Sequence, residues 1–132
     1  MKVQEKPLVG SWRMNYHVAT VAGLTPDQAQ TLLFGNTSKD EYATWYEFAP
    51  RDLVVTIDYP LDPGGEVRIP ASAFTRRDMP SLGLFLLAVA REYRELYKKP
   101  AKYGIWGHDL SDLYFERVTV AKDGTVELAV GS

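Results

Sequence analysis

One segment, from about Pro80 to Lys99, constrains the fold of this chain more than any other feature. Its first half, Leu82 to Ala90, is apolar nearly all round, and its second half mixes apolar and charged residues with helical spacing. A helix with such a surface cannot stay exposed, because its apolar side chains must be buried by other elements. Pro100 ends the segment. We therefore expect a long helix that lies across a sheet, with other segments covering its flanks.

Several other segments alternate apolar and polar residues with a period of two, which is typical of half-buried strands. They are residues 8–18, 42–48, 53–59 and 66–70, followed by the two arms of a hairpin around Asp123-Gly124. A shorter helix is expected at about 26–34, with Thr25 as N-cap, Pro26 in the first turn and Gln28 completing a capping box. This order predicts an α+β fold: an antiparallel sheet of five or six strands, with the long helix at about 80–99 packed on one face.

The pairing of the third and fourth strands can be predicted from the residues that would meet. Setting Tyr59 opposite Val67 also brings Asp58 opposite Arg68, so that apolar residues and opposite charges both match. Asp62-Pro63-Gly64-Gly65 would supply the turn between them. A slip of one residue destroys both matches, and this register is therefore predicted.

The loop of the C-terminal hairpin can be predicted in the same way. A loop of three residues, 122–124, with Gly124 left-handed sets Val120 opposite Val126 and keeps the apolar residues of both arms on one face. A two-residue loop would set Val120 opposite Glu127 instead. The three-residue loop is therefore expected.

The alternating pattern divides the sheet residues between two faces. The inward residues are Trp12, Met14, Tyr16, Phe48, Val55, Ile57, Val67, Ile69, Val118, Val120, Val126 and Leu128. The opposite face collects Arg13, Asn15, His17, Trp45, Glu47, Thr56, Asp58, Arg68, Arg117 and Glu127.

A large aromatic residue such as Trp45 on a polar face is unexpected unless something covers it, which makes this face a candidate binding surface. The candidate binding residues are Arg13, His17, Trp45, Glu47, Asp58, Arg68 and, from another segment, Trp106. The alternative is an ordinary solvated sheet face, with Trp45 covered by the short helix or with a different register for the strand at 42–48.

Composition excludes several classes of function for this chain, whose 132 residues suit a single domain, 1–132. Fifteen Lys and Arg against seventeen Asp and Glu give a formal net charge of -2, whereas a general binder of phosphate backbones needs a basic surplus. The absence of cysteine excludes cysteine nucleophiles, disulfides and thiolate metal sites. Strong nucleotide-binding and hydrolase signatures are also missing. We expect no nucleic-acid partner, no metal and no cofactor.

The sequence also predicts no association with a membrane. Its longest uncharged run near the middle, Met79 to Ala90, is shorter than the roughly 20 apolar residues that a membrane-spanning helix needs. Residues 1–7 carry charges without an apolar stretch behind them, unlike a signal peptide. We therefore expect a cytoplasmic protein.

Charge is distributed unevenly along the chain. Residues 40–66 contain seven acids and one base, whereas residues 67–102 contain eight bases and three acids. Either the acidic region is a docking face, or the two oppositely charged surfaces attract each other weakly and do nothing more.

The most unusual segment is Tyr103–Asp112, in which two glycines bracket an Ile-Trp pair and a histidine follows. His108 could act as a general base oriented by Asp109 or Asp112. Alternatively the segment is a returning loop, in which Trp106 plugs the edge of the core and Asp109 or Ser111 caps a turn.

Leu8-Val9-Gly10-Ser11-Trp12 resembles the Gly-x-Trp opening strand of lipocalins and fatty-acid-binding proteins. The resemblance implies a closed β-barrel that holds an apolar ligand. The strong helix at about 80–99 departs from that pattern, since those barrels have strands there, and no family is assigned.

These observations favour a small, soluble, non-enzymatic binding protein that recognises a protein partner. One form of this function is an inhibitor of the immunity-protein type, whose acidic surface blocks a basic enzyme. An enzyme using His108 is less favoured, because no nucleophile or metal set accompanies it. The other alternative is a domain that binds an apolar ligand in a pocket between helix and sheet, lined by Trp12, Tyr16, Tyr46, Phe48 and Phe85.

Overall fold

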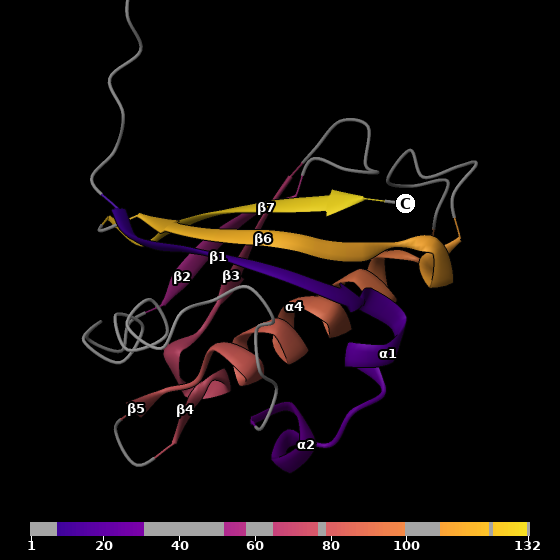
Figure 1. Ribbon diagram of the computed structural model, residues 1–132, viewed down its shortest axis with the longest axis horizontal. Helices are drawn as coiled ribbons and strands as arrows, with labels where there is room; N and C mark the ends of the chain where they lie inside the picture. Colours follow the sequence, from indigo (N-terminus) through magenta and orange to yellow (C-terminus); the bar gives the residue numbers. More distant parts are fainter. Residues whose placement is uncertain are drawn as a thin grey trace, which may run out of the picture.

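The computed structural model describes residues 8–30, 52–57, 65–76, 79–99, 109–121 and 123–131. In this part of the chain five strands form one sheet, and a long helix packs across one side of it (Figure 1). The expected α+β architecture with one main helix is confirmed. The strands follow the order β1-β6-β7-β2-β3, with the bounds β1 Leu8–His17, β6 Tyr114–Ala121, β7 Thr125–Gly131, β2 Leu53–Ile57 and β3 Gly65–Ile69.

The main helix, α4, runs over Leu82–Leu96, so it is shorter at both ends than the predicted 80–99. It begins after Ser81, whose side-chain oxygen accepts a hydrogen bond from the Leu84 N–H at 3.2 Å. This N-cap satisfies one of the donors that the first turn leaves unpaired, which is why the helix begins at Leu82. None of the helices in the described ranges is long and apolar enough to span a membrane.

Shorter elements surround α4, as its apolar surface requires. The helices α1 and α2 contact it, as do β3 and the 3-10 helix η1. The bounds of these elements are α1 Val18–Ala22, α2 Pro26–Gln30, η1 Ala71–Ala73, the two-stranded pair β4 Thr75–Arg76 and β5 Met79–Pro80, and η3 Leu110–Asp112.

The two short helices follow directly on β1. The strand that we expected to reach Val18 ends at His17, and the Val18 N–H donates to the Leu113 carbonyl at 3.0 Å as α1 begins. The capping box of α2 is confirmed: the Gln28 N–H donates to Thr25 Oγ1 at 3.2 Å, and the Thr25 N–H donates to Gln28 Oε1 at 3.0 Å. The end predicted for this helix and the strand predicted at 42–48 lie outside the described residues.

The sheet is mixed, which corrects the prediction of a purely antiparallel sheet. β1 and β6, β6 and β7, and β2 and β3 pair in antiparallel fashion, but β2 and β7 run parallel. Turn residues indicate how each hairpin closes on itself. The direction in which two hairpins meet depends on the long connections between them, which carry no comparable local signal.

The register of β2 and β3 differs from the prediction. Val55 lies opposite Val67, where Tyr59 was expected, so β2 is shifted by four residues. A shift by an even number keeps every side chain on its original face, and the apolar residues therefore still point inward. The match of apolar residues predicted correctly which side chains face the core. It could not distinguish between registers that differ by an even number of residues, because these place the same side chains on that face.

The hairpin of β6 and β7 has the predicted register, with Val120 opposite Val126. Gly124 has φ of 92°, the left-handed region that was expected for it. Its N–H donates to the Ala121 carbonyl at 3.0 Å, which closes the loop.

Replacing Gly124 with alanine is expected to lower the free energy of unfolding by about 1–2 kcal/mol, because a Cβ is disfavoured at this φ. Gly65 is the matched control, since a Cβ added there would meet no atom within 4 Å. Gly65→Ala should change stability by less than about 0.5 kcal/mol. Urea denaturation of both variants measures the difference, and equal losses would argue against the left-handed loop.

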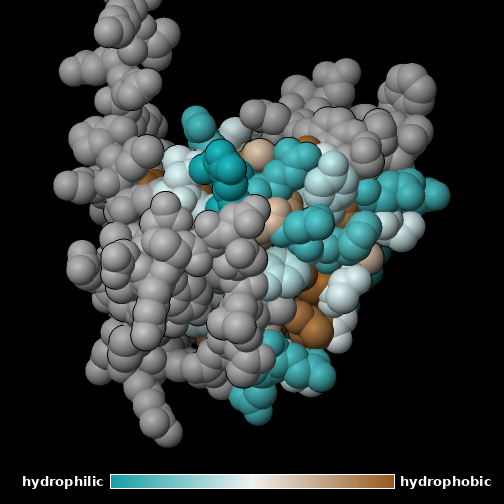
Figure 2. Space-filling view, in the orientation of Figure 1, coloured by the Kyte–Doolittle hydropathy of each residue, from teal (hydrophilic) through white to brown (hydrophobic). Residues whose placement is uncertain are grey.

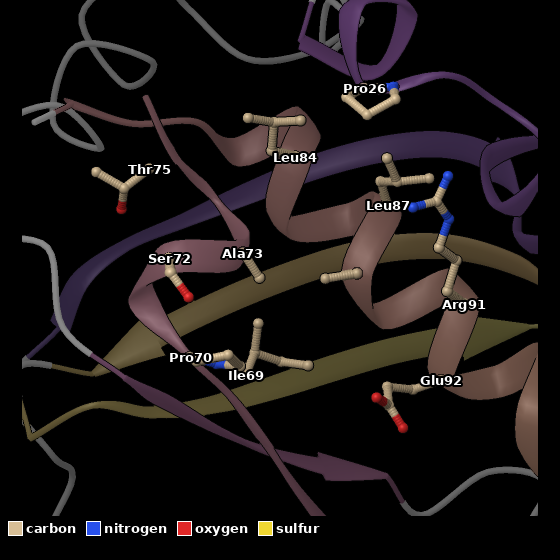
Figure 3. Close-up of a pocket in the computed structure, with 11 residues that line it drawn as sticks. Pro26, Ile69, Pro70, Ser72, Ala73, Thr75, Leu84, Leu87, Arg91 and Glu92 are labelled. Carbon is tan, nitrogen blue, oxygen red and sulfur yellow. The ribbon is translucent and has the colours of Figure 1, made fainter. Parts of the chain in front are cut away.

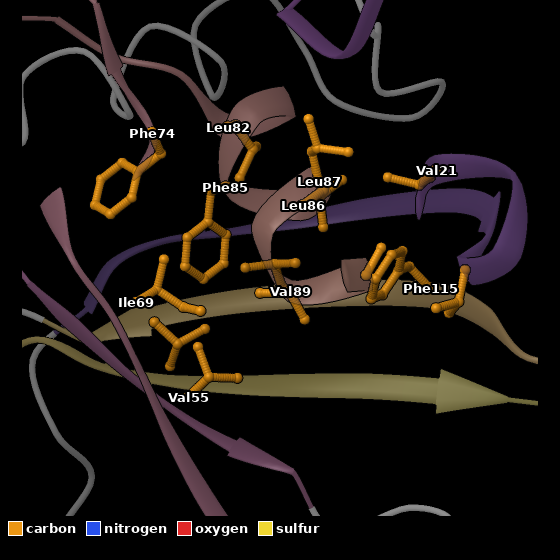
Figure 4. Close-up of a cluster of buried hydrophobic side chains, with 14 of the residues drawn as sticks. Val21, Val55, Ile69, Phe74, Leu82, Phe85, Leu86, Leu87, Val89 and Phe115 are labelled. Carbon is orange, nitrogen blue, oxygen red and sulfur yellow. The ribbon is translucent and has the colours of Figure 1, made fainter. Parts of the chain in front are cut away.

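The inner face of the sheet and α4 enclose the hydrophobic core (Figure 4). Each described residue of the predicted inward set is buried or packs against the core: Trp12, Met14, Tyr16, Val55, Ile57, Val67, Ile69, Val118, Val120, Val126 and Leu128. Burial of these side chains supplies the main stabilising term of the fold. Phe48 lies outside the described residues.

The described strands form an open sheet with β1 at one edge and β3 at the other. A closed barrel would need β1 and β3 to pair with each other. Among the described strands β1 pairs with β6, and β3 pairs with β2. The barrel implied by the resemblance to lipocalins is therefore not the arrangement of this part of the chain.

Candidate functional site

The polar residues of the sheet form one surface on the side away from α4, which we call the outer face. The strand register arranges these residues in rows that run across the strands. One row consists of Ser11, Thr119, Glu127, Thr56 and Glu66. Where these strands lie in Figure 1, the described surface in Figure 2 is mainly hydrophilic. The outer face comprises Ser11, Arg13, Asn15, His17, Val54, Thr56, Glu66, Arg68, Tyr114, Glu116, Arg117, Thr119, Thr125, Glu127 and Ala129.

Two arginines stand side by side on this face. Arg13 of β1 lies directly opposite Arg117 of β6. Arg13 is exposed and Arg117 half-buried, while the adjacent Trp12 and Val118 are buried, so both arginines belong to the outer face. Like charges at directly opposed positions destabilise a sheet by a few tenths of a kcal/mol or more. The pair concentrates two guanidinium groups, which recognise carboxylates and phosphates by bidentate hydrogen bonds.

Hydroxyl groups position one of these guanidinium groups. Arg117 Nη1 donates to Ser11 Oγ at 2.8 Å, and Ser11 Oγ lies 2.9 Å from Thr119 Oγ1. The three side chains thus form a hydrogen-bonded chain across β1 and β6. Such a chain restricts the rotamers of Arg117 and holds its charge at one place on the outer face.

Thr119→Val is expected to lower the free energy of unfolding by about 1 kcal/mol, because it removes a hydrogen bond of this chain. Thr75 offers a matched contrast within the described residues, since its buried Oγ1 has no hydrogen-bond partner. Thr75→Val should therefore raise stability by up to about 1 kcal/mol. Urea denaturation compares the two variants. A loss for Thr75→Val as large as that for Thr119→Val would contradict the assignment.

An aromatic corner ends the outer face near the last residue of β1. The rings of His17 and Tyr114 lie in an edge-to-face arrangement, with centroids 6.2 Å apart. The Tyr114 side chain also covers Gly131 of β7, where an added Cβ would lie 2.8 Å from Tyr114 Cζ and 2.6 Å from Glu116 Oε1. The glycine thus permits the close approach of the tyrosine ring.

Arg68 lies at the opposite edge of the sheet from Arg13, on β3. Four steps of about 4.8 Å between strands separate the two by roughly 19 Å. Arg68 faces Val54 instead of the predicted Asp58, and its Nη1 lies 3.5 Å from Asp52 Oδ2. Since both side chains are largely exposed, this ion pair contributes little stability.

The candidate catalytic carboxylates are part of a capped turn. The Asp109 N–H donates to Asp112 Oδ2 at 3.2 Å, and the Asp112 N–H donates to the Asp109 carbonyl at 2.9 Å. These contacts fit the structural interpretation that the sequence left open for the segment. Several candidates lie outside the described residues: Trp45, Glu47, Asp58, Trp106 and His108.

A second candidate site is a cavity of about 540 Å³ bounded by α4, the end of β3, η1 and the start of α2 (Figure 3). The pocket expected between helix and sheet is different: two of its proposed lining residues, Trp12 and Phe85, are completely buried in the core. The cavity is lined by Pro26, Ile69, Pro70, Ser72, Ala73, Thr75, Leu84, Leu87, Ala88, Arg91 and Glu92.

Sequence reasoning placed Arg117 on the polar face but did not select it as a binding residue, and it missed Tyr114. The signal for Arg117 was its alternation with buried Val118. For the cavity, helical spacing shows that one face of α4 carries Leu84, Leu87, Ala88 and Arg91. The sequence of the helix does not show which other elements pack beside that face.

Comparisons of the chain with protein-family models, with curated proteins and with solved structures gave no match.

Proposed function

We propose that this chain is a non-enzymatic binding protein that recognises a protein partner through the outer face. The observation that carries the proposal is the direct opposition of Arg13 and Arg117 across β1 and β6. The opposition places two guanidinium groups on one part of the outer face, and each can recognise an acidic side chain of a partner by paired hydrogen bonds. Arginine and tyrosine are also among the residue types enriched in protein interfaces, and Tyr114 lies on the same face.

The charges of the outer face suggest what the partner presents. The row containing Arg13 and Arg117 lies next to the row containing Glu127 and Glu66. A complementary partner therefore carries an acid opposite the arginines and a base opposite the glutamates. Such a pattern fixes the orientation of binding and suppresses partners with the wrong charges.

An inhibitor of the immunity-protein type is the specific form of this proposal. It requires acids that reach a basic enzyme, and Glu66 and Glu127 are available on the outer face. Asp52 is engaged locally, since its Oδ1 accepts the Ala71 N–H at 3.0 Å and its Oδ2 lies near Arg68. In this form Glu66 and Glu127, rather than Asp52, contact the enzyme.

The test is copurification of a stoichiometric protein partner with the tagged chain, followed by titration of the purified pair. The double variant Arg13→Glu with Arg117→Glu should weaken binding by about 100-fold, equivalent to about 2.7 kcal/mol. Lys99→Glu is the matched control for either single reversal, because it makes the same change of charge as one Arg→Glu substitution at an exposed position beyond α4. It should leave the affinity within about twofold.

Arg13→Glu alone separates binding from folding. As a substitution of an exposed side chain that turns a like-charge pair into an opposite-charge pair, it should not lower the free energy of unfolding by more than about 0.5 kcal/mol, while it weakens the partner's affinity. Partner binding that survives both arginine reversals unchanged would overturn the proposal.

A further inference from the structure

The cavity beside α4 has the construction of a small-molecule site, independent of the outer face. Its volume of about 540 Å³ lies within the range of about 300–1,000 Å³ that is common for ligand pockets. Most of its described lining residues are apolar, and the charged ones among them are Arg91 and Glu92. Sites of this kind take their affinity from apolar surface and their orientation from a few polar groups.

The floor of the cavity comes from one face of α4. Leu84, Leu87 and Ala88 follow the helical spacing that places side chains on a common stripe. The two leucines are almost fully buried, at 5% and 3% exposed, whereas Ala88 is half-buried. Ala88 lines the cavity together with Ala73 of η1 and Arg91, and its small side chain occupies little of the space.

Arg91 is held on the α2 side of this space. Its Nη2 donates to the Leu24 carbonyl at 3.3 Å, which fixes the guanidinium near Pro26 (Figure 3). That contact uses one of the five N–H donors of a guanidinium group, so a positioned Arg91 can also donate to an anion. Glu92 lies on another side of the cavity, near Ile69 (Figure 3).

We propose that this cavity binds a small amphipathic carboxylic acid, with its apolar chain over Ala88 and its carboxylate at Arg91. The planar guanidinium matches a carboxylate through two parallel hydrogen bonds. Glu92 repels the carboxylate from the other side, so the two charges together fix one orientation of the ligand. An apolar ligand without a carboxylate would lack the contact with Arg91 that orients it. A cationic ligand would have to bind in the opposite orientation, with its charge at Glu92.

Two probes of equal chain length test the proposal: decanoate and decylammonium, each below its micelle concentration, titrated calorimetrically into the full chain. Decanoate should bind at least tenfold more tightly than decylammonium. Arg91→Gln should weaken decanoate by at least tenfold, whereas Glu92→Gln, which removes the repelling carboxylate, should strengthen decanoate and weaken decylammonium. Ala88→Leu and Ala88→Phe should progressively weaken both probes by filling the cavity.

Circular dichroism and thermal unfolding establish that each variant is folded before its affinity is read. Binding of decylammonium at least as tight as that of decanoate would overturn the proposal, as would undiminished decanoate binding by both Ala88 variants. These results would not bear on the outer face, whose arginines lie on the other side of the sheet.

Discussion

Replacing Trp12 with alanine is expected to lower the free energy of unfolding by about 3–5 kcal/mol, among the largest effects of any single substitution in this chain. Trp12 is completely buried on the inner face of β1, opposite Val118. Its removal deletes a large apolar side chain and leaves a cavity that the packed layer of sheet and helix cannot close. An effect of this size approaches the total stability of many small domains.

The same substitution distinguishes a core residue from a ligand-contacting one. Leu128→Ala is the control, because Leu128 packs against the same core but is only half-buried. Its loss should be smaller, about 1–2 kcal/mol, as less apolar surface is withdrawn from water. Guanidinium denaturation followed by circular dichroism measures both. If Trp12→Ala changed stability by less than about 1 kcal/mol, Trp12 would be a pocket-lining residue, as the alternative of an apolar-ligand domain requires.

Phe85→Ala should also lower the free energy of unfolding by about 3–5 kcal/mol. Phe85 is completely buried in α4 and meets Phe74 edge to face, with ring centroids 5.5 Å apart. This contact joins the main helix to the segment between η1 and β4, so Phe85 stabilises both the core and the wall of the cavity.

A double-mutant cycle with Phe74→Ala isolates the aromatic pair. The double variant should lose about 0.5–1.5 kcal/mol less than the sum of the two single losses, because each single substitution already removes the contact between the rings. Thermal and chemical denaturation of the two single variants and the double variant provide the measurement. Strictly additive losses would mean that the two rings do not contact each other in solution.

Local patterns in the sequence predicted the face of each side chain better than the pairing of the strands. Alternation alone separated buried Trp12 from exposed Arg13, because a strand places neighbouring side chains on opposite faces. The hairpin loop at Gly124 was predictable, since the three-residue loop keeps the apolar residues of both arms on one face and the two-residue loop does not. The register of Val55 with Val67 was not, because the turn residues and apolar pairs allowed several registers with the same faces.

The candidate site was less accessible to sequence reasoning, for a physical reason. Arg13 and Arg117 become neighbours only through pairing of two strands that are distant in the chain, and no local pattern reports which strands will pair. The cavity likewise requires η1 and α2 to meet the same face of α4. Sequence alone identified the polar surface; the arrangement of its charges came from the topology.

The central claim, that the outer face is the partner-binding surface, is tested most directly by hydroxyl-radical footprinting of the chain with and without its copurified partner. His17 and Tyr114 report on the outer face, and Tyr97, another half-buried tyrosine, reports on the end of α4. Binding should lower the oxidation of His17 and Tyr114 severalfold and leave that of Tyr97 unchanged. Protection of Tyr97 with continued oxidation of His17 and Tyr114 would contradict the claim.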